Sequence, residues 1–297
     1  MPAKGIHAIQ HADILSYEVL LRVAEAAVAI GVEKIRVTGG EPLVRKGIIH
    51  FLERLALIPG LKQLVLTTNG ILLPEMAAEL RCAGVEGLNI SLDSLCPNNF
   101  AGITRGGDLR KVLEGIKAAE RAGFHSIKIN VVVMRGVNDD EIADFAALTL
   151  DRPYRVRFIE YMPILRDDKW KRRLFTGEEV LERLSRQFEL LPASRETMAG
   201  PATYYQIAGA AGMIGVITPI SCHFCNECNR IRVTSTGVAK GCLFATETHD
   251  LKPFIKTGNG QALRDALRSV VNEKSERHAI AEPGRRNAIP PMFQVGG

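Results

Sequence analysis

Short runs of apolar and β-branched residues alternate with amphipathic stretches over about the first 165 residues. Runs rich in Val, Ile and Thr predict strands, and apolar positions three or four apart predict helices. The predicted strands are residues 34–38, 63–68, 87–93, 126–134 and 155–161, and the predicted helices are residues 50–57, 74–83, 108–122 and 139–148. This alternation predicts an α/β fold with a parallel sheet and helices outside it. An open doubly wound sheet and a partial barrel both fit the pattern.

The pattern changes after Met162. A charge-rich surface loop is expected at residues 166–173, a helix at 177–188, short strands at 213–217, 230–235 and 238–243, a helix at 260–271 and an extended tail from Lys274. These elements predict a smaller, antiparallel second unit. We therefore expect one domain over residues 1–165 and another over residues 166–297.

Composition narrows the class of protein. Hydrophobic residues make up 46% of the 297 residues and charged residues 24%, which is ordinary for a globular chain. No apolar run reaches the length of a membrane span, and no apolar leader follows Met1, so we expect a cytoplasmic protein without a membrane partner. The formal net charge of +5 is mild and suits an anionic partner without identifying it.

Cationic residues recur at strand positions that should face a protein interior. Residues two apart on a strand point to the same face. Same-face pairs of this kind are Lys34 with Arg36, Lys128 with Asn130, Arg155 with Arg157, and Arg230 with Arg232. The set favours a lumen built around an anion, with polyphosphate as the natural candidate, because Arg binds it bidentately and Lys as a point charge. The alternatives are strand ends that reach solvent, pairing with Glu41, Asp93 or Glu160, and, less well supported at 6% aromatic residues, a nucleic-acid groove.

Four of the six cysteines fall in one short window, which in a cytosolic protein indicates metal binding more often than disulfides. Cys225, Cys228 and Cys242 are separated by 2 and 13 residues and offer three thiolates. Three protein ligands suit a [4Fe–4S] cluster with one iron left open to another ligand. Structural zinc with Cys222 or His223 as fourth ligand fits equally well, and the spacing does not separate the two.

Several motifs together resemble the GTP 3′,8-cyclase family of radical S-adenosylmethionine (SAM) enzymes. The resemblance covers essentially the whole chain and rests on a combination of segments rather than on any one of them. The segments are residues 34–42 (KIRVTGGEP), 66–70 (LTTNG), 89–93 (NISLD), 128–130 (KIN), 157–162 (RFIEYM), 224–232 (FCNECNRIR), 241–244 (GCLF) and the terminal Gly296 and Gly297.

This resemblance implies a fold and a set of roles. The fold would be an incomplete (β/α)6 TIM-like radical SAM barrel followed by a C-terminal iron–sulfur domain. By position, Gly40, Ser91 and Met162 would bind SAM; Arg36, Thr67, Lys128, Arg230, Ile231 and Arg232 would bind GTP; and Cys225, Cys228 and Cys242 would hold a second [4Fe–4S] cluster. Lys34 and Arg157 would also line the lumen. No catalytic side chain is assigned.

The implied activity is that of a lyase in molybdenum cofactor biosynthesis. A radical derived from SAM would convert GTP to (8S)-3′,8-cyclo-7,8-dihydroguanosine 5′-triphosphate. The implied partners are GTP and the next enzyme of the pathway, with a homodimer left open and no nucleic acid.

One departure from the family concerns the first cluster. The family's Cys-x3-Cys-x2-Cys loop has no counterpart, because Met1 matches the position immediately after it. We expect either that the natural start lies upstream or that this is a truncated, inactive form that binds only GTP and the C-terminal cluster. Independently of this departure, a zinc-bearing phosphosugar-binding barrel is a further hypothesis for the function.

Overall fold

The computed structural model describes residues 10–162, 170–194, 200–222, 224–225, 228–245 and 247–274. These residues fold as two compact units, and neither unit is continuous along the chain. The first unit holds residues 67–81 and 86–228, and the second holds residues 2–66, 82–85 and 229–297, as far as these are described.

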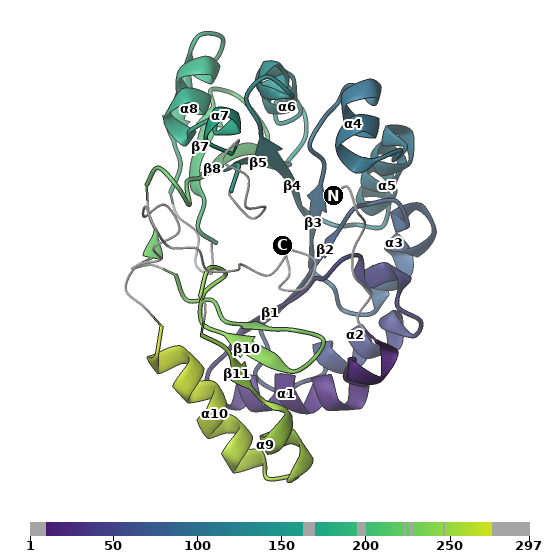
Figure 1. Cartoon of the computed structure of the whole chain (residues 1–297). Helices are drawn as coiled ribbons and strands as arrows, with labels where there is room; N and C mark the ends of the chain where they lie inside the picture. The colour runs from purple at the N-terminus through teal and green to yellow at the C-terminus, as the bar shows by residue number, and fades with distance from the viewer. Residues whose placement is uncertain are drawn as a thin grey trace. The chain divides into compact units, whose positions relative to one another are not determined.

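The first unit is built on a sheet in which β3, β4, β5, β8, β7 and β6 follow one another. Four strands run parallel, namely β3 (Gly87–Ser91), β4 (Ser126–Val133), β5 (Arg155–Glu160) and β8 (Met213–Ile217). Two more, β7 (Thr203–Ile207) and β6 (Leu190–Pro192), are antiparallel. The helices on its outer side include α4 (Pro97–Thr104), α5 (Leu109–Arg121), α6 (Ile142–Ala147) and α8 (Gly177–Ser185) (Figure 1). The unit also contains α3 (Leu73–Cys82), the 3-10 turn η3 (Asp139–Glu141) and the short helix α7 (Trp170–Arg173).

Strand β4 shows why the sheet has two different faces. Its buried residues alternate strictly with half-buried ones, so Ile127, Ile129, Val131 and Val133 form one face. Such alternation places the intervening Lys128 and Asn130 together on the opposite face. The sequence of β4 therefore dictates an apolar face for packing and a polar face for chemistry.

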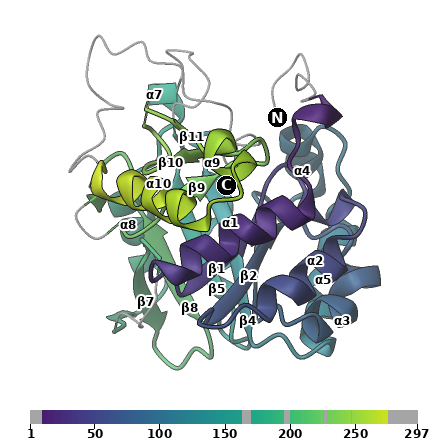
Figure 2. The same ribbon diagram turned by 90° about the horizontal axis from the view of Figure 1, so that it is seen from below.

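The second unit joins the two ends of the described chain in one core. Its elements are η1 (His11–Asp13), α1 (Tyr17–Ala29), β1 (Lys34–Val37), η2 (Pro42–Val44), α2 (Ile48–Ala56), β2 (Gln63–Thr68, whose last two residues belong to the first unit), β9 (Arg232–Val233), β10 (Val238–Lys240), β11 (His249–Asp250), α9 (Lys252–Lys256) and α10 (Gly260–Asn272). Strand β1 pairs with β2 in parallel, and β9, β10 and β11 form a small antiparallel sheet. Val23 of α1 packs in one cluster with Ala239 of β10 and Leu267 of α10. Figure 2 shows α1 and α10 on the same side of this unit.

Most sequence predictions of secondary structure are confirmed. The strands at residues 34–38, 63–68, 87–93, 126–134 and 155–161 are present as β1 to β5, and each ends within two residues of its predicted limit. The fold is α/β with a mainly parallel sheet, as expected. The helix at residues 139–148 is instead the turn η3 followed by the short helix α6. Helices α1 and α4 were not predicted.

Two predictions are wrong. Residues 213–217 form β8, which extends the main sheet in parallel to β5 rather than belonging to a separate antiparallel unit. Part of the loop predicted at residues 166–173 is the helix α7, while residues 163–169 lie outside the described part. The tail from residue 275, with Gly296 and Gly297, and His223 also lie outside it. Among the helices in the described ranges, none has the length and apolar character needed to cross a membrane.

Candidate functional site

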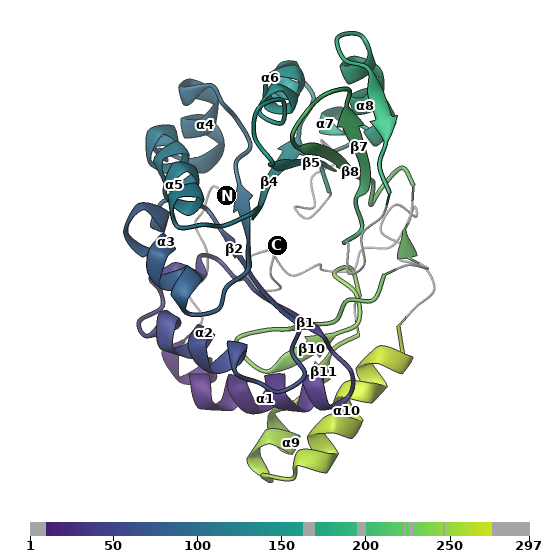
Figure 3. The same cartoon turned by 180° about the vertical axis from the view of Figure 1, so that it is seen from behind.

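Lys128 and Asn130 mark the polar face of the first unit's parallel strands, which we call the inner face. Two rows of polar side chains cross this face. Because residues in register on neighbouring parallel strands share a face, Asn89, Lys128 and Arg155 form one row. Ser91, Asn130 and Arg157 form the next row. Figure 3 shows strands β4 and β5 side by side, with α6 outside them. The predicted pairs Lys128 with Asn130 on β4 and Arg155 with Arg157 on β5 therefore share one face, and across the sheet Lys128 lies beside Arg155 and Asn130 beside Arg157.

Arg157 is the best-fixed cation of this face. Its Nη2 donates to Oδ1 of Asn89 at 2.7 Å, and its Nε donates to Oδ1 of Asn130 at 2.8 Å. Asn89 in turn donates from Nδ2 to the hydroxyl of Thr67 at 3.4 Å. Thr67, Asn89 and Arg157 are all more than nine-tenths buried. Neutral amide oxygens thus hold a buried guanidinium in one orientation, as a preformed anion site requires.

Gly215 of β8 makes room for this arginine. A Cβ at position 215 would lie 3.0 Å from Cγ of Arg157 and 2.9 Å from Cε1 of Tyr204. The buried hydroxyl of Tyr204 has no hydrogen-bond partner within the described ranges. Its ring also lies 5.9 Å from the Arg155 guanidinium carbon. This end of the inner face therefore combines two arginines with a hydroxyl that could bond a ligand.

Sequence analysis gave Asn89 no role, although it stands in one of the motifs. The available signal was its parity with Ser91, which puts both side chains on one face of β3. Asp93 and Glu160 were considered as partners for the cations, but Asp93 accepts a hydrogen bond from Val132 N at 2.8 Å and Glu160 accepts from Ile220 N at 2.8 Å. Burial raises the pKa of Asp93 to about 6, and the bond from Val132 N opposes that rise.

The remaining predicted site residues lie in two groups. Thr67, Lys128, Ser91 and Met162 belong to the first unit, whereas Gly40, Arg36, Arg230, Ile231 and Arg232 belong to the second. A Cβ at Gly40 would meet no atom within 4 Å, so there is open space beside its backbone. The Arg230 carbonyl oxygen accepts from Nζ of Lys274 at 3.1 Å, which connects the residues before β9 to those after α10.

A buried lysine accompanies these arginines in the second unit. Lys240 is 2% exposed and stands opposite Arg232 in the antiparallel pair of β10 and β9. Burial lowers the pKa of Lys240; the nearby thiol of Cys242 acts in the opposite direction, and Arg232 lowers it further. The small sheet therefore concentrates positive charge beside one of the predicted cluster ligands.

The three predicted cluster cysteines are half-buried thiols. Cys228 N donates to Cys225 O at 3.0 Å, so the backbones of these two cysteines lie close together, as in a chelating pair. Sγ of Cys242 accepts from Phe244 N at 3.5 Å, a type of bond that also stabilises cluster sulfurs. In the described part of the chain, no three His, Cys, Asp or Glu side chains are gathered as a ready metal site. The donor types thus fit an iron–sulfur cluster.

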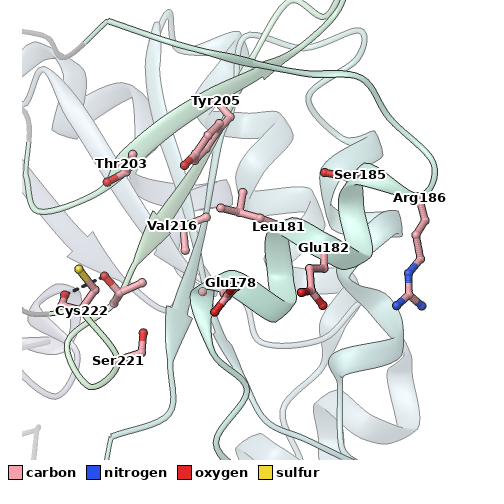
Figure 4. A pocket seen from close by; sticks show the side chains of 12 residues that line it. Glu178, Leu181, Glu182, Ser185, Arg186, Thr203, Tyr205, Val216, Ser221 and Cys222 are labelled. Atoms are coloured by element: carbon pink, nitrogen blue, oxygen red, sulfur yellow. Dashed lines mark hydrogen bonds between the residues drawn. The ribbon is translucent and has the colours of Figure 1, made fainter.

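A separate pocket of about 800 Å³ lies between α8 and the strands β7 and β8. Figure 4 shows Glu178, Leu181 and Glu182 along the helix side, with Thr203 and Tyr205 on the strand side. Ser221 and Cys222 lie at one end of it. None of the predicted SAM, GTP or cluster residues lines this pocket, and Cys222 entered only as an alternative zinc ligand.

Comparison with known proteins gives consistent matches. Residues 3–149 match the Radical SAM superfamily, and residues 154–280 match Molybdenum Cofactor Synthesis C. The chain is 58% identical to the GTP 3′,8-cyclase of Geobacter sulfurreducens, over 100% of this chain and 91% of that protein. It is 43% identical to the enzyme of the same name from Alkaliphilus oremlandii, and 41% identical to that of Thermodesulfovibrio yellowstonii. All of this chain and 92% of each relative are covered in both comparisons.

Proposed function

The chain belongs to the GTP 3′,8-cyclase family, and from that premise we propose that it binds GTP on the inner face of β3, β4 and β5 and cyclises it in a SAM-dependent radical reaction. The observation that carries this proposal is the buried Arg157, held by Asn89 and Asn130. Membership of a radical SAM family implies a [4Fe–4S] cluster and SAM. When bound, these supply the radical chemistry of the reaction.

The chain's own residues would bind and orient the substrate. Lys128 and Arg157 are adjacent-row cations that would hold phosphate oxygens, with Arg157 oriented by Asn89 and Asn130 and Lys128 acting as a point charge. Thr67 would offer its hydroxyl from the adjoining strand end. Arg36, Arg230, Ile231 and Arg232 are carried over from the family motifs as further GTP contacts, and Gly40, Ser91 and Met162 as SAM contacts.

We further propose that Cys225, Cys228 and Cys242 hold the family's second [4Fe–4S] cluster. The support is the backbone hydrogen bond from Cys228 to Cys225, the amide bond to Cys242 Sγ, and the positive charge of Lys240 and Arg232 on the strands nearest Cys242. Positive charge beside a thiolate-bound cluster stabilises its negative charge. A cytoplasmic location, contact with the next pathway enzyme and a homodimer remain proposals, as does the absence of nucleic-acid binding.

GTP binding to the 297-residue chain tests the substrate proposal. Arg157→Lys retains the charge but loses the guanidinium bonds to Asn89 and Asn130 that orient it, so we expect the Kd for GTP, measured by titration calorimetry, to rise about tenfold. Arg152→Ala is the matched control, because this basic residue of the same unit makes only a partly exposed ion pair with Glu120 at 3.1 Å. Unchanged GTP affinity in Arg157→Lys would remove Arg157 from the site.

Metal content tests the cluster proposal. After anaerobic reconstitution we expect about four irons and four sulfides for each set of cluster cysteines, and loss of both in Cys225→Ser. Cys96→Ser serves as the control, since Cys96 is also half-buried but begins α4. Purified protein that holds zinc and takes up no iron would support the zinc interpretation instead.

A further inference from the structure

Glu160, the last residue of β5, is a buried carboxylate that accepts hydrogen bonds on both oxygens. It is 2% exposed. Its Oε2 accepts from Ile220 N at 2.8 Å and from Ser221 N at 3.0 Å. Its Oε1 accepts from Gly177 N at 2.9 Å and from the Ser221 hydroxyl. Three backbone amides and one hydroxyl therefore compensate the burial of this charge.

The segment that Glu160 holds leads directly to the proposed cluster ligands. We call residues 218–222 the approach segment, because in the sequence it follows the end of β8 and precedes Cys225. Within it, the Thr218 hydroxyl donates to Cys222 O at 2.9 Å. Ser221 and Cys222 are exposed at the end of the pocket in Figure 4, so side-chain packing contributes little at these two residues. The Glu160 carboxylate is thus the hydrogen-bond anchor of residues 220 and 221.

We infer that Glu160 is a positioning residue for the cluster: it fixes the approach segment so that Cys225 and Cys228 are presented as a preorganised pair of ligands. This inference rests on the proposed second cluster. Groups that orient metal ligands without touching the metal commonly change metal affinity 10-fold to 100-fold when removed. Glu160 would not contact the ligating cysteines themselves and would act on them through the backbone of residues 220–222.

The carboxylate form is what the geometry requires. Each oxygen accepts two hydrogen bonds, and an amide at this position would turn an NH₂ group toward N–H donors. Glu160→Gln therefore removes part of the anchor while preserving side-chain volume. We expect it to loosen the approach segment without removing any cluster ligand.

The chain offers a matched control in Glu141. This residue is 6% exposed and also accepts on both oxygens, from the Ser94 hydroxyl, Leu95 N, Cys96 N and Asn99 Nδ2. Its loop leads to α4 and contains none of the proposed cluster ligands. Glu141→Gln should therefore impose a similar structural penalty without a specific effect on the cluster.

The experiment compares the reconstituted 297-residue protein with Glu160→Gln and Glu141→Gln. We expect Glu160→Gln to release iron to a chelator roughly tenfold faster than the wild type and to show a changed EPR spectrum of the reduced cluster. We expect Glu141→Gln to release iron at the wild-type rate, even if its thermal midpoint is lower. Equal release from the wild type and Glu160→Gln, or equally fast release from both variants, would overturn the inference.

Two further readouts keep the outcomes distinct. A wild-type protein that binds no iron under reconstitution would contradict the proposed second cluster itself. If Glu160→Gln fails to fold, Ser221→Ala removes only the hydroxyl donor and leaves the three amide bonds in place. We then expect a smaller but measurable acceleration of iron release, and an unchanged rate would overturn the inference.

Discussion

Glu141 and Glu160 use the same chemistry in two regions of one unit. Each is a buried carboxylate whose two oxygens accept hydrogen bonds from a loop distant in sequence. Glu141 organises the loop that starts α4, which is a structural task. Glu160 organises the segment before the proposed cluster cysteines, where a small displacement would have chemical consequences. The burial and the hydrogen-bond donors of a carboxylate therefore do not reveal its functional importance. What distinguishes the two carboxylates is the segment that follows each bonded loop, which is α4 for Glu141 and the proposed cluster cysteines for Glu160.

The largest effect should come from removing the Glu141 side chain. Glu141→Ala would leave several donors of residues 94–99 without their acceptor, and we expect a loss of about 3 kcal/mol or more in the free energy of unfolding. Urea unfolding measures it. Iron binding by the folded fraction should be unchanged, and a specific loss of iron would break the distinction between the two carboxylates.

Near Glu160, the first residue of α8, Gly177, packs closely against β8 and the residue after it. A Cβ at Gly177 would lie 2.4 Å from Cγ2 of Thr218 and 2.7 Å from Cγ1 of Val216. Gly177→Ala should therefore cost about 2–3 kcal/mol of stability through overpacking and should also accelerate iron release, because the Gly177 amide bond to Glu160 would be displaced. Stability loss with unchanged iron release would show that this bond does not contribute to cluster positioning.

The stability of the folded state should depend on pH through Asp93, which immediately precedes the loop bonded to Glu141. Because the pKa of Asp93 is raised from 3.8 to about 6, the folded state holds its proton more tightly than the unfolded state. This contribution makes stability fall as pH rises from about 4 to about 6. Asp93→Asn should remove that slope and gain about 1–2 kcal/mol at pH 7 relative to pH 4, after allowance for partial solvent access. Unfolding measured across this range checks it, and identical pH slopes would contradict the assignment.

The smallest effect concerns helix α4 itself. Gly102 is exposed within this helix, and a Cβ there would meet nothing within 4 Å. Gly102→Ala should stabilise the protein by about 0.5–1 kcal/mol, because alanine favours the helix. Thermal unfolding measures the gain, and a loss of stability would indicate a contact made by the glycine backbone.

The sequence predicted the parallel strands and their inner face, because both depend on local alternation. In β4 the period-two pattern alone places Lys128 and Asn130 opposite the apolar residues. It did not predict that β8 joins this sheet, since strand pairing depends on residues more than 50 positions apart. The roles of Glu141 and Glu160 were hidden for the same reason. Glu160 bonds residues 60 and 61 positions away, and no local pattern specifies such partners.

The sequence predicted which residues belong to the candidate site better than it predicted how those residues contact one another. Arg157 was expected on the inner face, but the amides of Asn89 and Asn130 that orient it emerged only from the folded chain. Alternation does not reveal hydrogen-bond geometry. The predicted SAM, GTP and cluster assignments otherwise remain predictions, and the division at residue 165 does as well.

The shared core of α1, β10 and α10 has a consequence for synthesis on the ribosome. Val23 packs in one cluster with Leu267, and Leu15 N donates to Ser235 O at 2.8 Å. At roughly 5–20 residues per second, α1 would emerge some tens of seconds before these partners exist. Its apolar face must wait in solution or be covered by a chaperone during that interval. Slow translation would therefore prolong the exposure of the apolar face of α1, and premature termination before β10 and α10 would make it permanent. We expect such shortened chains to aggregate.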